Sequence, residues 1–118
     1  MTPDYKDIIT KAYIGFNDRN IGAVLALMDA NVKWPKAFEG GYVTGHEAVG
    51  EYWTRQWSEI NPKVEPALIT ERADGKIEVV VNQLVKDLEG TVLFDGKVNH
   101  VYGFENGLIT VMDVEEVS

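Results

Sequence analysis

The amino-acid sequence predicts an α+β domain in which helices come first and strands follow. Helical periodicity is confined to the first half of the chain. From Pro62 onward, apolar runs rich in Val and Ile alternate with glycine-containing turn signals, which is typical of antiparallel strands. Asn106-Gly107 is the clearest turn signal, because both central residues of a type I′ turn need a positive φ. The order indicates one domain, residues 1–118, with helices packed on an antiparallel sheet.

Two helices are expected before residue 30. Residues 4–19 carry apolar side chains at helical intervals, so that they form one continuous stripe. A second, shorter helix is expected after Asn20, with its apolar side chains running from Ile21 to Met28. The stripe of the first helix consists of Tyr5, Ile8, Ile9, Ala12, Tyr13 and Phe16.

The stretch before Pro62 is expected to hold a short strand and a third helix. Residues 32–34 read as a strand, and Pro35 ends it because proline cannot donate to a sheet ladder. Thr44 and Glu47 have the spacing of a capping box, in which each side chain caps the backbone of the other residue. We therefore expect the third helix to begin directly after Thr44.

Four strands are expected in the second half of the chain. The turn signals Asp74-Gly75, Glu89-Gly90 and Asn106-Gly107 separate them. One of Asn82 and Gln83, inside the apolar run "IEVVVNQLV", is expected to point inward, where its amide needs a hydrogen-bond partner. The strands are expected at about 64–72, 77–88, 91–104 and 108–115.

The last hairpin sets the register of the two final strands. An unbroken ladder from the Asn106-Gly107 turn pairs Tyr102 with Val111 and His100 with Asp113. Directly opposed side chains are close enough to interact. Because this sheet face is otherwise apolar, His100 and Asp113 form either a neutralised buried pair or the polar end of a pocket. The outer face of the sheet would then carry Val101, Met112 and Val114.

Composition excludes several classes of protein. A net charge of −8 argues against a nucleic-acid partner, and no apolar run approaches the roughly 18 residues of a membrane span. The chain has no cysteine, and its N-terminus "MTPDYKDIIT" lacks the features of a signal peptide, so the cytoplasm is the expected compartment. Without a glycine-rich phosphate loop or a metal-spaced histidine set, we expect no cofactor and no metal.

Three sequence stretches, together with the N-terminal helices, resemble one superfamily. The stretches are "DANVKWP", "TGHEAVGEYW" and "HVYGFENGLITVMD". Over nearly the whole chain they resemble the nuclear transport factor 2-like superfamily, and within it the SnoaL-like polyketide cyclases and the ketosteroid isomerases. The resemblance implies a cystatin-like cone, in which a strongly bent antiparallel sheet wraps over three N-terminal helices and leaves a mostly apolar pocket. It also implies a homodimer formed through the outer face of the sheet.

The resemblance suggests catalytic residues. Tyr13 matches the oxyanion tyrosine of the ketosteroid isomerases, and His100 stands where they carry a protonated carboxylic acid. Their general base is an aspartate that precedes a proline. Here Trp34 precedes Pro35, and an indole cannot abstract a proton. Steroid isomerisation by that mechanism is therefore not expected.

The SnoaL-like cyclases match the final hairpin better. They carry an acid/base aspartate on the last strand and a histidine on the strand before it, as Asp113 and His100 are placed here. A carboxylate that apolar neighbours such as Val111 shield from water has a raised pKa, which suits acid/base chemistry on a carbonyl compound. A purely structural pair and a non-catalytic ligand contact remain alternatives.

Two hypotheses about function therefore stay open. The first is a cofactor-independent cyclase, isomerase or lyase acting on a small hydrophobic carbonyl compound. The second is a binding module of the same fold, which holds a ligand or dimerises without turnover. Aromatic side chains either stack on a flat ligand or belong to the core. The candidate substrate-binding residues are Trp34, Phe38, Trp53, Trp57, Tyr102 and Val111.

Overall fold

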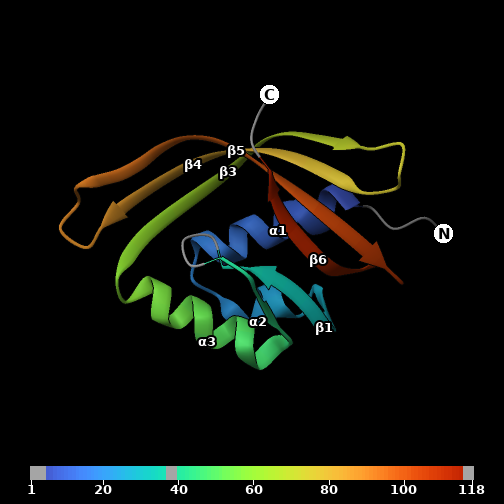
Figure 1. Cartoon of the computed structure of the whole chain (residues 1–118), viewed down its shortest axis with the longest axis horizontal. Helices are drawn as coiled ribbons and strands as arrows, with labels where there is room; N and C mark the ends of the chain where they lie inside the picture. The colour runs from blue at the N-terminus through green and yellow to red at the C-terminus, as the bar shows by residue number, and fades with distance from the viewer. Residues whose placement is uncertain (1–4, 37–39, 116–118) are drawn as a thin grey trace.

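The computed structural model describes residues 5–36 and 40–115 (Figure 1). It confirms the α+β class, with the helices in the first half of the chain. Phe38, a predicted ligand contact, lies outside the described residues. The elements are α1 Tyr5–Asn17, α2 Ile21–Leu25, β1 Met28–Pro35, β2 Tyr42–Thr44, α3 His46–Trp57, β3 Ile60–Glu71, β4 Ile77–Asp87, β5 Val92–Glu105 and β6 Leu108–Glu115.

Within the described residues, the strands form one six-stranded sheet in the order β2-β1-β6-β5-β4-β3. All neighbouring pairs are antiparallel except β1 with β6, which is parallel. Figure 1 shows the long strands β3, β4 and β5 arching over α1, with α2 and α3 on the same side of the sheet. The predicted cone of helices beneath a bent sheet is therefore confirmed, with a mixed rather than a purely antiparallel sheet.

The hydrophobic core lies between the sheet and the helices. Gly15 on α1 lets α2 approach closely, since a Cβ at this position would lie 2.7 Å from Val24 Cγ2. No helix in residues 5–36 or 40–115 is long and apolar enough to cross a membrane. Core side chains with at most 5% exposure include Ile9, Tyr13, Trp53, Val79, Val81 and Tyr102.

The start of α3 differs from the prediction. The N-cap is Gly45, with φ 90°, and it makes no side-chain capping bond, so the predicted capping box of Thr44 and Glu47 is wrong. Thr44 instead ends strand β2 and pairs with Lys33. The chain has to turn sharply from strand to helix here, and glycine adopts the required positive φ without strain.

The final hairpin contains a bulge that the sequence-based register lacks. Asn106 and Gly107 have φ values of 54° and 80°, as the predicted type I′ turn requires. Gly103 pairs with Val111, whereas its neighbour Phe104 pairs with Ile109, so Thr110 is an extra residue on β6. A Cβ on Gly103 would lie only 2.7 Å from Val111 Cγ1, so glycine allows this close approach.

Beyond the bulge, every pair is displaced by one residue. His100 pairs with Val114, and Asp113 pairs with Val101, so the predicted direct pairing of His100 with Asp113 is wrong. A displacement by one residue moves side chains to the opposite face of a sheet. Met112 and Val114 therefore face the helices, and their predicted place on the outer face is wrong.

Candidate functional site

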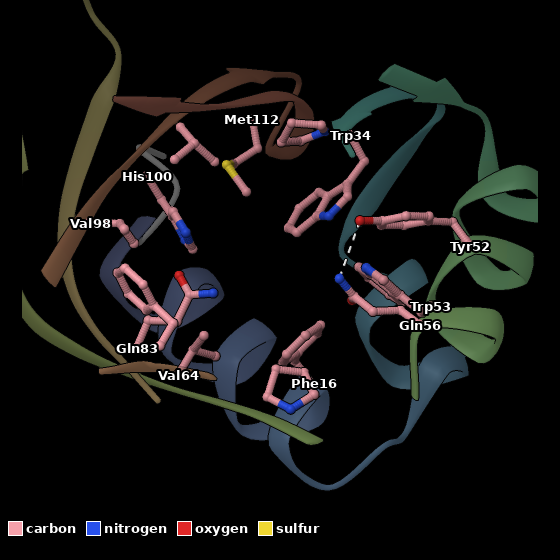
Figure 2. A pocket seen from close by; sticks show the side chains of 14 residues that line it. Phe16, Trp34, Tyr52, Trp53, Gln56, Val64, Gln83, Val98, His100 and Met112 are labelled. Carbon is pink, nitrogen blue, oxygen red and sulfur yellow. Dashed lines mark hydrogen bonds between the residues drawn. The ribbon is translucent and has the colours of Figure 1, made fainter. Parts of the chain in front are cut away.

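A cavity of about 180 Å³ lies between the sheet, α1 and α3 (Figure 2). Its walls are mostly apolar, and no Asp, Glu, Lys or Arg is among the described residues that line it. Besides the indole N–H groups of its tryptophans, four polar side chains among the described residues reach it: Tyr52 and Gln56 from α3, Gln83 from β4 and His100 from β5. The apolar lining includes Phe16, Trp34, Val64, Val98, Met112 and Val114.

Two buried tyrosines hold His100 in place. Tyr13 lies on the α1 face that carries Ile9 and Ala12, and this face packs against the sheet. Tyr102 Oη donates a hydrogen bond to Tyr13 Oη over 2.8 Å, and 2.7 Å separate Tyr13 Oη from His100 Nδ1. Because Tyr13 Oη accepts from Tyr102, its own proton is available to His100. Tyr13 therefore donates this proton in a hydrogen bond, and Nδ1 of His100 is the acceptor. The three side chains form one hydrogen-bonded chain.

This chain determines the protonation state of His100. Burial lowers the pKa of His100 from its ordinary value of 6.5 to about 4, so the imidazole is neutral at pH 7. Since Nδ1 accepts from Tyr13, the proton of the neutral ring is on Nε2. No described residue hydrogen-bonds to Nε2. His100 therefore presents an N–H donor to the cavity rather than a basic nitrogen.

Both tyrosines remain protonated under the same conditions. Burial, reinforced by the neighbouring Tyr102, raises the pKa of Tyr13 well above 10.0. Burial also raises the pKa of Tyr102, and the hydrogen bond to Tyr13 offsets only part of this effect. Each hydroxyl is thus a fixed donor at neutral pH. The direction of the chain, from Tyr102 through Tyr13 to His100, is therefore the one expected around neutral pH.

Asp113 lies away from this chain. Its neighbours Met112 and Val114 line the cavity, and successive side chains alternate across a strand, so Asp113 is on the outer face of the sheet. There its carboxylate accepts a hydrogen bond from Tyr42 Oη, which raises the pKa of that tyrosine. The link ties β2 to β6 across the outer face. Asp113 does not meet His100, and its acid/base role stays a prediction.

The other predicted site residues lie in four different places. Trp34 and Trp53 line the cavity beside His100. Tyr102 lies behind His100, as Tyr13 does, and not at the cavity wall. Trp57 stacks on Trp53, with 5.9 Å between ring centroids, and the Arg19 guanidinium covers its ring. Val111 is on the outer face with Asp113. Binding of a substrate by any of these residues stays a prediction.

Two glutamines add polar groups to the cavity wall. The expectation that one of Asn82 and Gln83 points inward is confirmed, because Gln83 lines the cavity and Asn82 is exposed. Gln56 was missed. Its spacing of four residues from Tyr52 and three from Trp53 places it on the same face of α3, and this was the available signal.

The comparisons identify the fold. A protein from Burkholderia pseudomallei described as nuclear transport factor 2-like matches with a TM-score of 0.82 at 24% identity, over 95% of this chain and 89% of that one. The chain has the nuclear transport factor 2-like fold. No protein-family model and no curated protein matches the sequence.

Two further structures with this fold were solved with ligands. TerC, co-crystallised with polyporic acid, matches with a TM-score of 0.81 at 24% identity, over 95% of this chain and 90% of that one. RV0760c from Mycobacterium tuberculosis, in complex with estradiol-17beta-hemisuccinate, matches with a TM-score of 0.82 at 17% identity, over 98% and 95%. At 24% and 17% sequence identity, these matches show a similar fold.

Proposed function

We propose that this protein binds a small, ring-containing carbonyl compound in the cavity, with its oxygen hydrogen-bonded to His100. The observation that carries the proposal is the Nε2–H group of His100, an oriented donor in an apolar cavity that no described residue satisfies. This donor faces a mostly apolar cavity, so an acceptor oxygen placed there gains a hydrogen bond worth about 0.5–1.5 kcal/mol. The aromatic rings of Phe16 and Trp34 suit a flat ligand.

The volume of the cavity limits the size of this ligand. An engineered apolar cavity of about 150 Å³ takes up benzene, whereas pockets for drug-sized ligands measure roughly 300–1,000 Å³. The cavity here has about 180 Å³. It therefore suits one substituted ring better than several fused rings. The ligands in the TerC and RV0760c structures support binding of small organic molecules by this fold.

The proposal can be tested with acetophenone and α-methylstyrene, which differ in one atom group: C=O in the first and C=CH₂ in the second. His100→Asn keeps an acceptor for Tyr13 near the Nδ1 position and removes Nε2–H. We expect calorimetry to show that this variant binds acetophenone about 5–10-fold more weakly than the wild type, the effect of one hydrogen bond. Its affinity for α-methylstyrene should not change. An equal loss for both ligands would contradict the proposal.

A second candidate function is enolisation of such a ketone, as in the enzyme hypothesis, with a base from the solvent taking the α proton and the Nε2–H group of His100 stabilising the enolate oxygen, since no described lining residue is a carboxylate. The observation that favours it is the hydrogen-bonded chain of Tyr102, Tyr13 and His100, a preorganised donor of the kind that stabilises oxyanions. An enolate oxygen is a stronger acceptor than a ketone oxygen, so such a donor favours the reactive state. Exchange of the methyl protons of acetophenone in D₂O, followed by NMR, tests this candidate. If exchange is no faster than in buffer, enolisation is contradicted and ligand binding is the function that remains.

We also propose that the chain forms a homodimer. Several large apolar side chains of the described residues are exposed, and exposed apolar patches of sufficient size mark interaction sites. Leu88, Val92 and Leu93 lie at the β4–β5 hairpin, and Leu68 lies apart from them on β3, where it pairs with Val80. The basis for the dimer therefore shifts from the residues predicted on the outer face to these side chains.

A further inference from the structure

The cavity carries polar side chains on two opposite walls. His100 and Gln83 belong to the sheet wall, and in Figure 2 Tyr52 and Gln56 from α3 lie across the cavity from them. Apolar side chains such as Phe16 line the space between the two walls. A ligand that spans the cavity therefore meets hydrogen-bonding groups at both ends.

The α3 wall contributes N–H donors. Gln56 Nε2 donates one hydrogen bond to Tyr52 Oη over 3.2 Å, and the amide carries a second N–H. Trp53, three residues earlier, has a buried indole N–H with no hydrogen-bond partner among the described residues. Figure 2 shows the indole nitrogen at the edge of Trp53 that faces the cavity. Because residues three apart share a helix face, both N–H groups can serve one acceptor atom.

We propose that Gln56 and Trp53 form a second polar subsite, which takes a second acceptor oxygen of the ligand. The inference rests on the proposed function, in which His100 takes the first oxygen. Since His100, Gln56 and Trp53 all present N–H donors, the ligand carries acceptors at both ends.

The ligand class follows from the charge of the cavity. No Lys or Arg is among the described lining residues, and an unpaired carboxylate is costly to bury. Neutral carbonyl oxygens fit the donors on both walls without this cost. The ligand class is therefore a diketone or quinone built on a single ring, and not a carboxylic acid.

A matched pair of ketones tests the second subsite. 1,4-Diacetylbenzene has a carbonyl at each end, and 4-ethylacetophenone has the same length with one carbonyl replaced by CH₂. By calorimetry, we expect the wild type to bind the diketone about 5–10-fold more tightly, which exceeds the roughly twofold statistical advantage of a symmetric ligand. Gln56→Met should reduce this preference, because only the Trp53 N–H then remains for the second oxygen, and it should leave the affinity for 4-ethylacetophenone within about twofold of the wild type, since Met keeps the side-chain length without the amide N–H donors.

The control is Thr54→Val on the exposed face of α3, which should retain the preference. Equal affinities of the wild type for the two ketones would overturn the second subsite. So would a preference that is undiminished in Gln56→Met or one that is lost in Thr54→Val. The first subsite has a separate readout: His100→Asn should weaken both ketones alike. If it weakens neither, the proposed function fails instead.

Discussion

His100 is bonded to Tyr13, and Tyr13 to Tyr102, so two hydroxyl groups take the place that a carboxylate was expected to occupy. The difference matters for the chemistry of the imidazole. A carboxylate partner stabilises the charged ring and raises its pKa, whereas neutral hydroxyls in an apolar interior leave the effect of burial dominant. The result is a neutral ring with a pKa of about 4, which acts as a hydrogen-bond donor and as a poor base.

The lowered pKa of His100 predicts how stability depends on pH. Its pKa is about 4 in the folded protein and 6.5 in the unfolded chain, so the unfolded chain binds more protons between these values. The free energy of unfolding should therefore fall as the pH drops from 6.5 to 4, by about 3 kcal/mol from this residue. His100→Asn should lack this component. Urea unfolding of both proteins at several pH values measures it, and parallel profiles would contradict the assignment.

Among the structural elements, the bulge on β6 determines which side chains reach the cavity. Without the extra residue Thr110, Asp113 would pair with His100 and Met112 would face away from the helices. The bulge depends on Gly103, because a side chain there would collide with Val111. Because residue 103 is glycine, the cavity wall carries the thioether of Met112 and not the carboxylate of Asp113.

Gly103→Ala tests this dependence. The added Cβ would lie 2.7 Å from Val111 Cγ1, so we expect the free energy of unfolding to decrease by about 1–3 kcal/mol, as for other overpacked sites. Val111→Ala in the same chain removes the colliding methyl group. The double variant should be less destabilised than the sum of the two single changes, which denaturant unfolding can measure. Additive effects would mean that a steric clash with Val111 is not the reason why position 103 requires glycine.

Asp113→Asn tests the placement of the second predicted site residue of the final hairpin, the carboxylate on β6. Because Asp113 is on the outer face and bonded to Tyr42, its neutralisation should leave the affinity for acetophenone within about twofold of the wild type, less than one hydrogen bond. The pKa of Tyr42 should fall toward 10.0, since the carboxylate that raises it is gone. NMR titration of Tyr42 and calorimetry measure the two effects. If Asp113→Asn loses as much ligand affinity as His100→Asn, Asp113 contributes to ligand binding and its placement on the outer face is contradicted.

The elements were more predictable than the register between them. Strands β4 and β6 lie within one residue of their expected bounds, because apolar periodicity and the glycine turns mark them locally. The inward direction of His100 also followed from alternation along β5. The bulge did not, since it depends on contact between Gly103 and Val111 on different strands. Gly103 inside a strand was the available signal, as such glycines often mark a bulge. The α3 contribution to the cavity required knowledge of how the helix packs.

For the whole molecule, the exposed apolar side chains predict association. Leu88, Val92 and Leu93 are 63%, 52% and 57% exposed, so a second copy that covers them would remove substantial apolar area from water. We expect light scattering at micromolar concentration to give twice the chain mass of 13.2 kDa. Leu93→Glu should lower this mass toward that of one chain without affecting acetophenone binding. The mass of a single chain for the wild type would rule the dimer out.

The enclosure of the cavity by sheet and helices also predicts an upper limit on ligand size. Trp34 on β1 forms part of the wall and packs edge-on against Trp53, with 5.2 Å between the ring centroids. In a cavity of about 180 Å³, a second fused ring would have to displace this wall, at a cost typical of overpacking, about 1–3 kcal/mol. We therefore expect the wild type to bind 2-acetylnaphthalene about tenfold more weakly than acetophenone.

Trp34→Leu keeps the wall apolar and makes room for the second ring, so it should reverse this order of affinities. Trp57→Leu is the matched control: Trp57 stacks on the same Trp53 but is not among the residues that line the cavity. It should lower the free energy of unfolding and leave the preference for the single ring unchanged. Calorimetric titration of the three proteins with both ketones gives the comparison. If the wild type binds 2-acetylnaphthalene as tightly as acetophenone, Trp34 does not set the limit and the cavity opens to larger ligands.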